Sequence, residues 1–435
     1  MSAGICIMNK NAIAMAADSA VTIGQHAAIH NSANKLFALS KYEPIGAIIY
    51  ANAEFMRIPM EIIIKEYKRT LGKKCFDTLN EYVQDFVMYL EQNVELYHFD
   101  LNEEHYVNQV FINLLNGLAL GYERRISDKV DIVQRELTQE ELEEVALSAY
   151  NETIEFIDAQ KELSTPTFSK YVEEKYAGNI AGYISAKFKW LSEEQAKTLE
   201  ASIYSVYDRQ FLRGIYVGMA IAGYGRKDIF PHMYHIHLGG MINGSTRYVI
   251  KEDAFISEKR PATISPFAQT DVMQTFLFGI NDSVIQDMAN EIPRQIDKKI
   301  QSLNDSLFSE GNKGLVQKEI SGTTPNIIQQ IAQKANEKYM QPILQSVATL
   351  PIEELALLAE SMINITSIRR KVALDDNIGT VGGPIDVAII SKGDGLVWMK
   401  RKHYFDIAHN LQYAFTRYAE TQEPHRGEDH EEDKK

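Results

Sequence analysis

The sequence contains few cysteines, and it has no net positive charge. Its 435 residues include two cysteines, Cys6 and Cys75, which are too few for a disulfide framework or a zinc cluster and indicate a reducing compartment. The formal net charge of −14 argues against nucleic acid or an anionic membrane as the main partner. We find no run of 18 apolar residues and no signal-peptide pattern, so we expect a soluble, cytoplasmic protein.

The overall composition is that of a globular protein. Hydrophobic residues make up 45% of the chain and charged residues 24%. The length allows two or three ordinary domains, or one domain with large insertions. The last residues, 418–435, include the run "ETQEPHRGEDHEEDKK", which predicts a disordered acidic tail.

The first 55 residues have a strand-like pattern. The runs "AGICIM" and "AIAMAA" flank an Asn-containing turn and predict a hairpin at the very start of the chain. The short apolar runs "AVTIG", "KLFAL" and "IGAIIYANA" follow, and they predict strands that are buried on both faces.

Helical and strand-like stretches then alternate in blocks. Apolar residues recur at a spacing of three and four from about residue 56 to about 213, which predicts a helical block of some 150 residues. Strand patterns return at "GIYVGMAIAGYG", "HMYHIHLGG" and "TRYVIKED", helical patterns follow, and "PIDVAIIS" and "GLVWMK" predict a last strand pair. Segregated blocks of this kind favour an α+β fold in which helices cover two sheets.

Ser2, Asp18 and Lys35 form a candidate catalytic group. If Met1 is removed, Ser2 carries both a hydroxyl and a free α-amine, whose reference pKa of about 7.7–8.0 suits it to act as a general base. A nearby lysine would keep that amine neutral, and an aspartate would hold the lysine in place. The residue types alone also fit a common Met-Ser start, a turn aspartate and a surface lysine.

The order of these motifs resembles the proteasome β-type peptidases of the N-terminal-nucleophile hydrolase superfamily. The matching stretches are "AADSAVT", "NSANKLF", "IGAIIYA", "VGMAIAGYG" with "HMYHIHLGG", and "VGGPID", the last of which is similar in particular to the bacterial Anbu branch. The resemblance covers roughly residues 2–60, 212–285 and 350–400. It implies a four-layer αββα sandwich formed by residues 2–55 and 212–410, with a large all-helical insertion at 56–211.

The resemblance also implies roles for single residues. Ser2 would be the nucleophile and its own α-amine the base, with Asp18 and Lys35 as the orienting and electrostatic pair. The backbone N–H of Ala51 would stabilise the oxyanion, where alanine replaces a family glycine and is tolerated while its φ stays negative. The family's supporting aspartate falls near Asp376 or Asn377, whereas its supporting serine, expected near "PFAQT", has no match.

The implied substrate site is small and apolar. Thr22 lies where the family's backbone pairs with an extended substrate. The resemblance assigns the pocket for the residue before the cleaved bond to four side chains, and these predict an apolar preference: Val21, Ala33, Ile49 and Ala53.

The leading functional prediction is a peptidase that assembles into a homo-oligomeric ring and uses no cofactor. A small-molecule amidase and a non-catalytic structural subunit remain alternatives, and an unfoldase partner stays open. A helical block that roofs the pocket would favour the amidase, and an open groove beside Thr22 would favour the peptidase. His232, His235 and His237 could chelate a metal at their spacing, but surface or packed histidines are favoured, so we predict no metal site.

Overall fold

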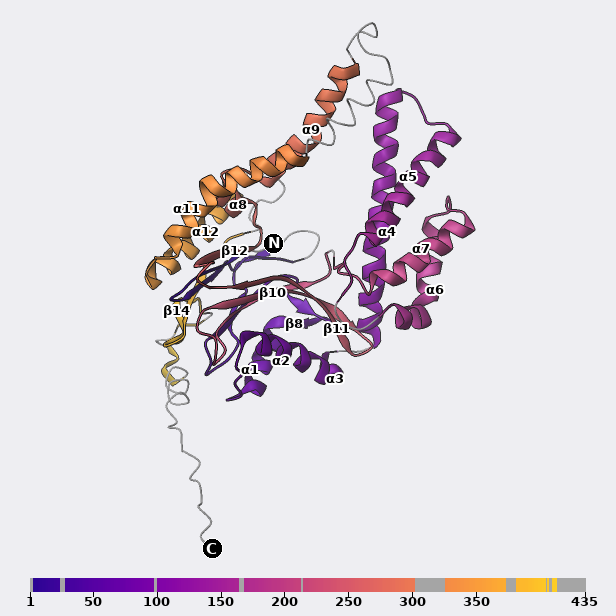
Figure 1. The fold of residues 1–435 in the computed structure, drawn as a ribbon. Helices are drawn as coiled ribbons and strands as arrows, with labels where there is room; N and C mark the ends of the chain where they lie inside the picture. Colours follow the sequence, from indigo (N-terminus) through magenta and orange to yellow (C-terminus); the bar gives the residue numbers. More distant parts are fainter. Residues whose placement is uncertain are drawn as a thin grey trace.

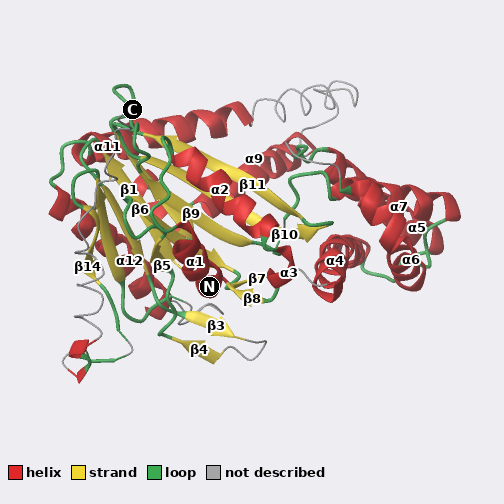
Figure 2. Ribbon diagram, turned by 90° about the horizontal axis from the view of Figure 1, so that it is seen from below, coloured by secondary structure: helices red, strands yellow, loops and turns green. Residues whose placement is uncertain are grey.

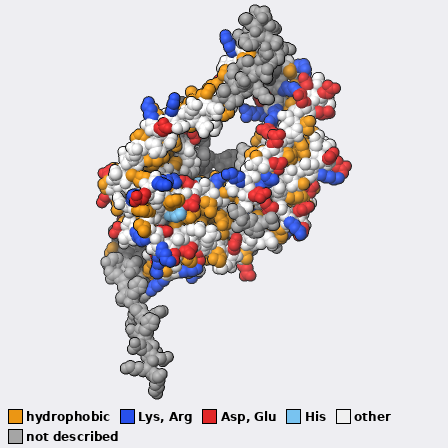
Figure 3. All heavy atoms as spheres, viewed as in Figure 1, with side chains coloured by type: hydrophobic (Ala, Val, Ile, Leu, Met, Phe, Trp, Pro, Cys, Tyr) orange, Lys and Arg blue, Asp and Glu red, His pale blue; other side chains and the backbone are white. Residues whose placement is uncertain are grey.

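A computed structural model describes residues 3–23, 28–97, 100–163, 168–212, 214–301, 325–372, 381–403, 405–406 and 409–412. The fold is a mixture of helices and antiparallel sheets (Figure 1). No helix within these residues is both long enough and apolar enough to cross a membrane. Acidic and basic side chains are interspersed over the face of the molecule shown in Figure 3.

Two five-stranded sheets form the centre of the fold. The strand order of the first is β12-β1-β2-β13-β14, and its strands are β1 (Ala3–Asn9), β2 (Ile13–Ala17), β12 (Ala262–Ala268), β13 (Asp386–Ser391) and β14 (Gly395–Lys400). The strand order of the second is β11-β10-β9-β6-β5, and its strands are β5 (Leu36–Ala38), β6 (Ile45–Ala51), β9 (Val217–Gly223), β10 (His232–Ile242) and β11 (Ser245–Phe255). Two small hairpins, β3–β4 (Val21–Ile23 and Ala28–His30) and β7–β8 (Glu54–Phe55 and Ile58–Pro59), complete the strands of the described residues.

The predicted hairpin at the start of the chain is confirmed. β1 pairs with β2 from Gly4–Ala17 to Met8–Ile13. The side chain of Asn9 closes the turn, because its Oδ1 accepts hydrogen bonds from the backbone N–H groups of Asn11 and Ala12. The turn is therefore formed by the asparagine that marked it in the sequence.

Both faces of β1 are buried, which explains its unbroken apolar sequence. Side chains alternate along a strand, so Ile5 and Ile7 join an apolar cluster with the helices over the first sheet. Cys6 and Met8 join a second cluster with residues of the other sheet, Ile48 among them. β1 is thus held in the interior rather than at the surface.

Helices lie on both sheets. α8 (Asp271–Phe278), α11 (Gln341–Val347) and α12 (Ile352–Val372) share the apolar cluster of the first sheet, and the π-helical segment η1 (Asn336–Met340) and α9 (Asp282–Gln301) continue from them (Figure 1). α1 (Met60–Leu71) and α2 (Leu79–Gln92) pack against the second sheet (Figure 2), and the short α3 (Val94–Tyr97) follows.

The remaining helices stand beside the sheets. They are α4 (Asp100–Val133), α5 (Gln139–Asp158), α6 (Ser169–Lys187) and α7 (Glu193–Val206) (Figure 1). The helical pattern predicted from about residue 56 begins at Met60, because residues 54–59 form the β7–β8 hairpin. Part of this block, α1 and α2, packs on the sheet, whereas α4 to α7 pack on one another and α4 also contacts β10.

A buried carboxylate fixes the first turns of α4. Glu103 is completely buried, and its Oε1 accepts hydrogen bonds from Tyr171, Lys175 and Tyr176 of α6 at 2.6–2.9 Å. Its Oε2 accepts one from the backbone N–H of Asn243, in the β10–β11 turn, at 2.7 Å. Burial raises the pKa of Glu103, but these hydrogen bonds outweigh it and lower the pKa to about 2. The carboxylate therefore joins α4, α6 and the second sheet.

A buried guanidinium completes this anchor. Arg247 of β11 is fully buried and donates to carbonyl oxygens at the end of α7, Val206 and Tyr207, and to the hydroxyl of Tyr106 on α4 at 2.8 Å. A cation at the C-terminal end of a helix is favoured by the helix dipole. The Tyr106 ring lies against Gly240, where a Cβ would approach to 2.7 Å. Any side chain at Gly240 would thus push α4 away from β10.

We expect Glu103→Gln to lower the free energy of unfolding by about 2–4 kcal/mol, because the amide cannot accept the same four hydrogen bonds and leaves buried donors unpaired. Urea denaturation at pH 7 measures this loss. Glu123→Gln, on an exposed position of α4, is the matched control and should stay within about 0.5 kcal/mol of the wild type. An equal effect of the two substitutions would contradict the anchoring role of Glu103.

Candidate active site

The Asp18 carboxylate is the centre of the candidate site. Asp18 follows β2, is 1% exposed, and accepts four hydrogen bonds. Oδ1 accepts from the backbone N–H of Ala3 at 2.9 Å and from Lys35 Nζ at 2.6 Å. Oδ2 accepts from the backbone N–H groups of Ala20 at 3.2 Å and Gly382 at 3.1 Å. One carboxylate therefore holds the first described residue of the chain, the lysine and the loop before β13.

Lys35 is a buried cation. It precedes β5, is 4% exposed, and donates to the carbonyl oxygen of Ala20 in addition to Asp18. Burial lowers the pKa of Lys35 from its ordinary value, and the adjacent Asp18 carboxylate opposes that shift. The structure thus brings together two of the three residues that the sequence singled out.

The glycine-rich run before β13 closes over Asp18. The backbone N–H of Ser19 donates to Gly382 O at 3.1 Å, in addition to the Gly382 bond to Asp18. Gly383 has φ +74°, and a Cβ there would lie 2.9 Å from the backbone oxygen of Asn31. This close approach accounts for a glycine in the "VGGP" run.

The backbone N–H of Ala51 is directed toward the Lys35 side of β6. Ile49 N donates to Lys35 O at 2.8 Å, whereas Asn52 N donates at 3.3 Å to the carbonyl oxygen of Tyr216, the residue before β9. Because N–H groups alternate in direction along a strand, Ala51 N–H points to the same side as that of Ile49, past the start of β5. Ala51 has φ 63°, so the expectation of a negative φ at this position is wrong, and the alanine occupies a left-handed conformation that favours glycine.

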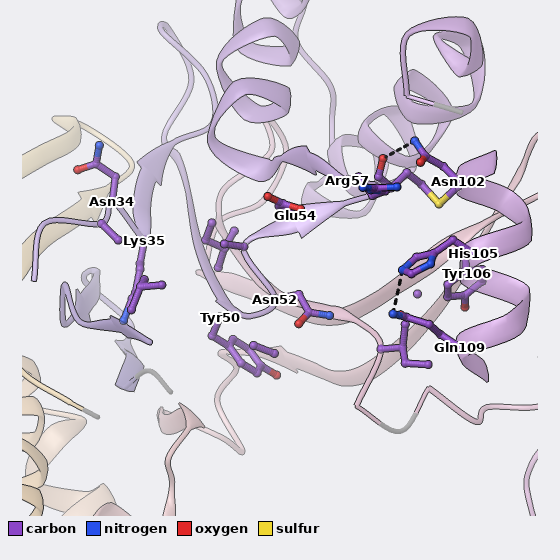
Figure 4. A pocket seen from close by; sticks show the side chains of 18 residues that line it. Asn34, Lys35, Tyr50, Asn52, Glu54, Arg57, Asn102, His105, Tyr106 and Gln109 are labelled. Atoms are coloured by element: carbon purple, nitrogen blue, oxygen red, sulfur yellow. Dashed lines mark hydrogen bonds between the residues drawn. The ribbon is translucent and has the colours of Figure 1, made fainter. Parts of the chain in front are cut away.

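A pocket of about 510 Å³ opens beside these residues (Figure 4). The residues of the sequence-based prediction that line it are Val21, Ala33, Lys35, Ile49, Ala51 and Ala53. Asp18 contacts Lys35 but does not itself line the pocket. The backbone of Thr22 pairs with Ile29 in the β3–β4 hairpin. Ser2 and Asp376 lie outside the described residues.

Sequence reasoning missed the polar side of the pocket. These lining residues are Asn52, Glu54 and Arg57 from the end of β6 and the β7–β8 hairpin, and Asn102, His105 and Gln109 from α4. The α4 residues recur at a spacing of three and four, which indicates one face of a helix. The spacing alone does not predict that this face lies against the end of β6, because the position of α4 depends on contacts between residues far apart in the sequence.

Tyr50 lies next to Ala51 and connects the pocket to two histidines. Its hydroxyl contacts Nε2 of His235 and lies 2.9 Å from Nε2 of His237, both on β10. Its ring covers Gly218, where no side chain could fit. Burial lowers the pKa of His235 to about 4 and that of His237 to about 3, so both rings are neutral at pH 7. Among the described residues, no group of three or more His, Cys, Asp or Glu side chains could hold a metal ion.

Comparisons with known proteins identify structural neighbours only. No protein-family model matches the chain, and no curated protein matches it. Among solved structures, it is similar to Anbu from Hyphomicrobium sp. strain MC1, with 9% sequence identity over 98% of this chain and 99% of that chain and a TM-score of 0.29. It is also similar to Anbu (ancestral beta-subunit) from Yersinia bercovieri, with 9% identity over 97% of each chain and a TM-score of 0.27. These proteins bear the name of the branch that "VGGPID" resembles. The TM-scores and the sequence identities are low, and the evidence for a function comes from contacts within this chain.

We expect the two histidines to make the fold sensitive to acid. In the unfolded chain a histidine has a pKa of about 6.5, so below that pH the unfolded state binds protons that the folded state rejects. Stability should therefore fall as the pH drops from about 6.5 toward 4, by about 2 kcal/mol at pH 5 for His235 and by less for the more exposed His237, where solvent screens the charge.

Urea denaturation of the wild type and of the double variant His235→Gln, His237→Gln at pH 7.5 and pH 5 measures this effect. The double variant should lose clearly less stability between the two pH values. His403→Gln, at an exposed position, is the control and should behave as the wild type. An equal loss in all three proteins would contradict the prediction.

Proposed function

We propose that the chain is an N-terminal-nucleophile hydrolase that cleaves amide bonds with Ser2. The observation that carries the proposal is that Oδ1 of Asp18 binds both the backbone N–H of Ala3 and the Lys35 ammonium. Ala3, the residue bonded to Ser2, therefore shares the carboxylate that binds Lys35, which supports the proposal. The proposal requires Ser2 to be the first residue of the mature chain.

The proposed reaction uses the hydroxyl and the α-amine of Ser2 and the backbone N–H of Ala51. The neutral α-amine of Ser2 accepts the hydroxyl proton, and the hydroxyl oxygen attacks the substrate carbonyl. The backbone N–H of Ala51 stabilises the resulting oxyanion. The amine then donates its proton to the leaving nitrogen, an ester on Ser2 remains, and water hydrolyses it to the acid. The positive charge of Lys35 favours the neutral form of the α-amine, and Asp376 would support the serine.

We further propose that the fold is a four-layer αββα sandwich of this hydrolase class. Residues 2–55 and 212–410 would form the hydrolase domain, residues 56–211 the helical insertion, and 418–435 a separate acidic tail. Three apolar clusters support the layered arrangement: one between the sheets, and one on the outer face of each sheet. No cofactor is required by the chemistry.

Assembly into a homo-oligomeric ring is part of the proposal. Exposed apolar side chains on the outer helices support it, namely Val284 and Met288 on α9 and Leu357, Ile368 and Val372 on α12. Apolar residues gathered on exposed helix faces are typical of surfaces that bind another subunit.

A peptide is the first candidate substrate. Val21, Thr22 and Ile23 form β3, which pairs on one side with β4, and no other strand of the described residues pairs with it. The second edge of β3 could therefore bind an extended peptide by backbone hydrogen bonds. The apolar side chains of Ala33 and Ile49 would contact the side chain of the substrate residue that precedes the cleaved bond.

A small-molecule amide is the second candidate substrate. Asn102, His105 and Gln109 of α4 line the pocket from the helical block, which encloses it on the side away from Lys35 (Figure 4). Enclosure of this kind favours a compact substrate over a long chain. The relative rates on a peptide and on its isolated amide unit would separate the two.

We expect a β-lactone or epoxyketone probe to label the wild-type protein on Ser2, because both warheads react with an N-terminal hydroxyl nucleophile. Intact-mass measurement should show that Met1 is absent and that one probe is bound. Ser2→Ala should abolish labelling while the circular dichroism spectrum is unchanged, and Ser2→Thr should retain labelling.

Labelling that persists in Ser2→Ala would overturn the nucleophile assignment. A protein with Met1 retained has no free Ser2 amine, and this result would leave the non-catalytic subunit as the remaining function. Ser32→Ala, at an exposed position close to the pocket residue Ala33, is the matched control and should label normally.

A further inference from the structure

The polar side of the pocket contains a cation that the proposed reaction does not use. Arg57 lines the pocket, its side chain is exposed, and no carboxylate of the described residues pairs with it. Figure 4 shows Arg57 beside Asn102 of α4 and Lys35 at the opposite end of the pocket. The Lys35 charge is already balanced by Asp18, so Arg57 is the pocket cation that is open to a ligand.

The backbone at Arg57 has an uncommon conformation. Met56 and Arg57 form the two-residue turn of the β7–β8 hairpin, with φ 48° and 64°. Turns of this type normally contain Asn-Gly, since a side chain at positive φ costs about 1 kcal/mol or more. Ala51, which also lines the pocket, shares the positive φ. Backbone strain of this kind is concentrated at functional sites.

Two contacts hold the strained turn in place. The Met56 side chain is buried in the cluster over the second sheet, where its Sδ lies 3.3 Å from the backbone nitrogen of Met241. The Met56 carbonyl oxygen accepts a hydrogen bond from Asn102 Nδ2 of α4 at 3.1 Å. The core and α4 thus fix the backbone that presents Arg57.

α4 contributes polar side chains to the same wall. The side-chain nitrogen of Gln109 lies 2.9 Å from Nε2 of His105. Figure 4 shows His105 on the same side of the pocket as Arg57. The wall therefore places hydrogen-bonding side chains beside the Arg57 guanidinium, and this combination suits an anionic oxygen group.

We infer that Arg57 is a specificity-determining residue that binds a carboxylate of the substrate, while the small apolar residues near Lys35 receive the group beside the cleaved bond. A guanidinium binds a carboxylate through two parallel hydrogen bonds. Glu54, on the same hairpin, also lines the pocket and disfavours a dianion more strongly than a monoanion. The carboxylate belongs either to an acidic side chain or to a free C-terminus. This inference rests on the proposed function for the identity of the reaction.

Three sets of acetylated apolar hexapeptides test the inference. The first set carries a single Glu at varied positions and a C-terminal amide. The second set carries Gln at the same positions and the same amide, so it is neutral. The third set carries Gln and a free C-terminal carboxyl. We expect the wild type to show a kcat/KM about tenfold higher for the best carboxylate-bearing peptide than for its neutral counterpart. Preference for the first set indicates a side-chain carboxylate, and preference for the third indicates the C-terminus.

Substitutions on the hairpin should change this preference in opposite directions. Arg57→Asn, which tolerates positive φ, should lower kcat/KM for carboxylate-bearing peptides about tenfold more than for neutral peptides, whereas Glu54→Gln should increase the preference about two- to fivefold. Arg57→Lys should restore part of it. Arg124→Gln, on an exposed position of α4 outside the pocket, is the control and should change neither rate.

Binding of the same peptides to the Ser2→Ala protein separates this inference from the proposed function. If the protein hydrolyses nothing, a carboxylate preference in binding that Arg57→Asn removes still supports the inference. Arg57→Gly, which relieves the backbone, replaces Arg57→Asn if that variant fails to fold. A wild type without a carboxylate preference in both assays, or an Arg57 variant that weakens charged and neutral peptides equally, would overturn it.

Discussion

The structure of the candidate site depends on one buried carboxylate. Asp18 accepts hydrogen bonds from Ala3, Lys35 and Gly382, which come from three distant parts of the sequence. Loss of one partner would leave a buried charge unpaired, and such losses typically cost about 3–5 kcal/mol. The same contact that orders the start of the chain therefore also places the lysine and the glycine-rich loop. The proposed catalytic geometry and the stability of the fold therefore depend on the same residue.

Helix α4 gives the pocket its second half. Glu103 and Arg247, both fully buried, fix the position of α4 relative to β10 and β11. α4 in turn binds the backbone of Met56 and supplies the polar residues opposite Lys35. The pocket therefore has an apolar end next to Lys35 and a polar end formed by the β7–β8 hairpin and α4. Its substrate range should depend as much on the anchoring of α4 as on the residues near Lys35.

The sequence alone predicted the elements that are determined by residues close together in the chain. The apolar runs around Asn9 predicted the β1–β2 hairpin, whereas the pairing of Asp18 with Lys35 was predicted from the resemblance of their motifs to N-terminal-nucleophile hydrolases. β12 was missed, because Pro266 interrupts its pattern, although an edge strand tolerates proline. The positive φ of Ala51 and the role of Arg57 were missed as well. Both depend on contacts between β6, the β7–β8 hairpin and α4, which no local pattern encodes.

The pKa of the Ser2 α-amine is the measurement that tests this account most directly. NMR titration of the protein labelled with ¹⁵N-serine should give a value below the ordinary range of about 7.7–8.0, since the Lys35 ammonium disfavours a second positive charge beside it. Lys35→Met should raise that value. A retained Met1, or an amine pKa within or above the ordinary range that Lys35→Met leaves unchanged, would contradict the account.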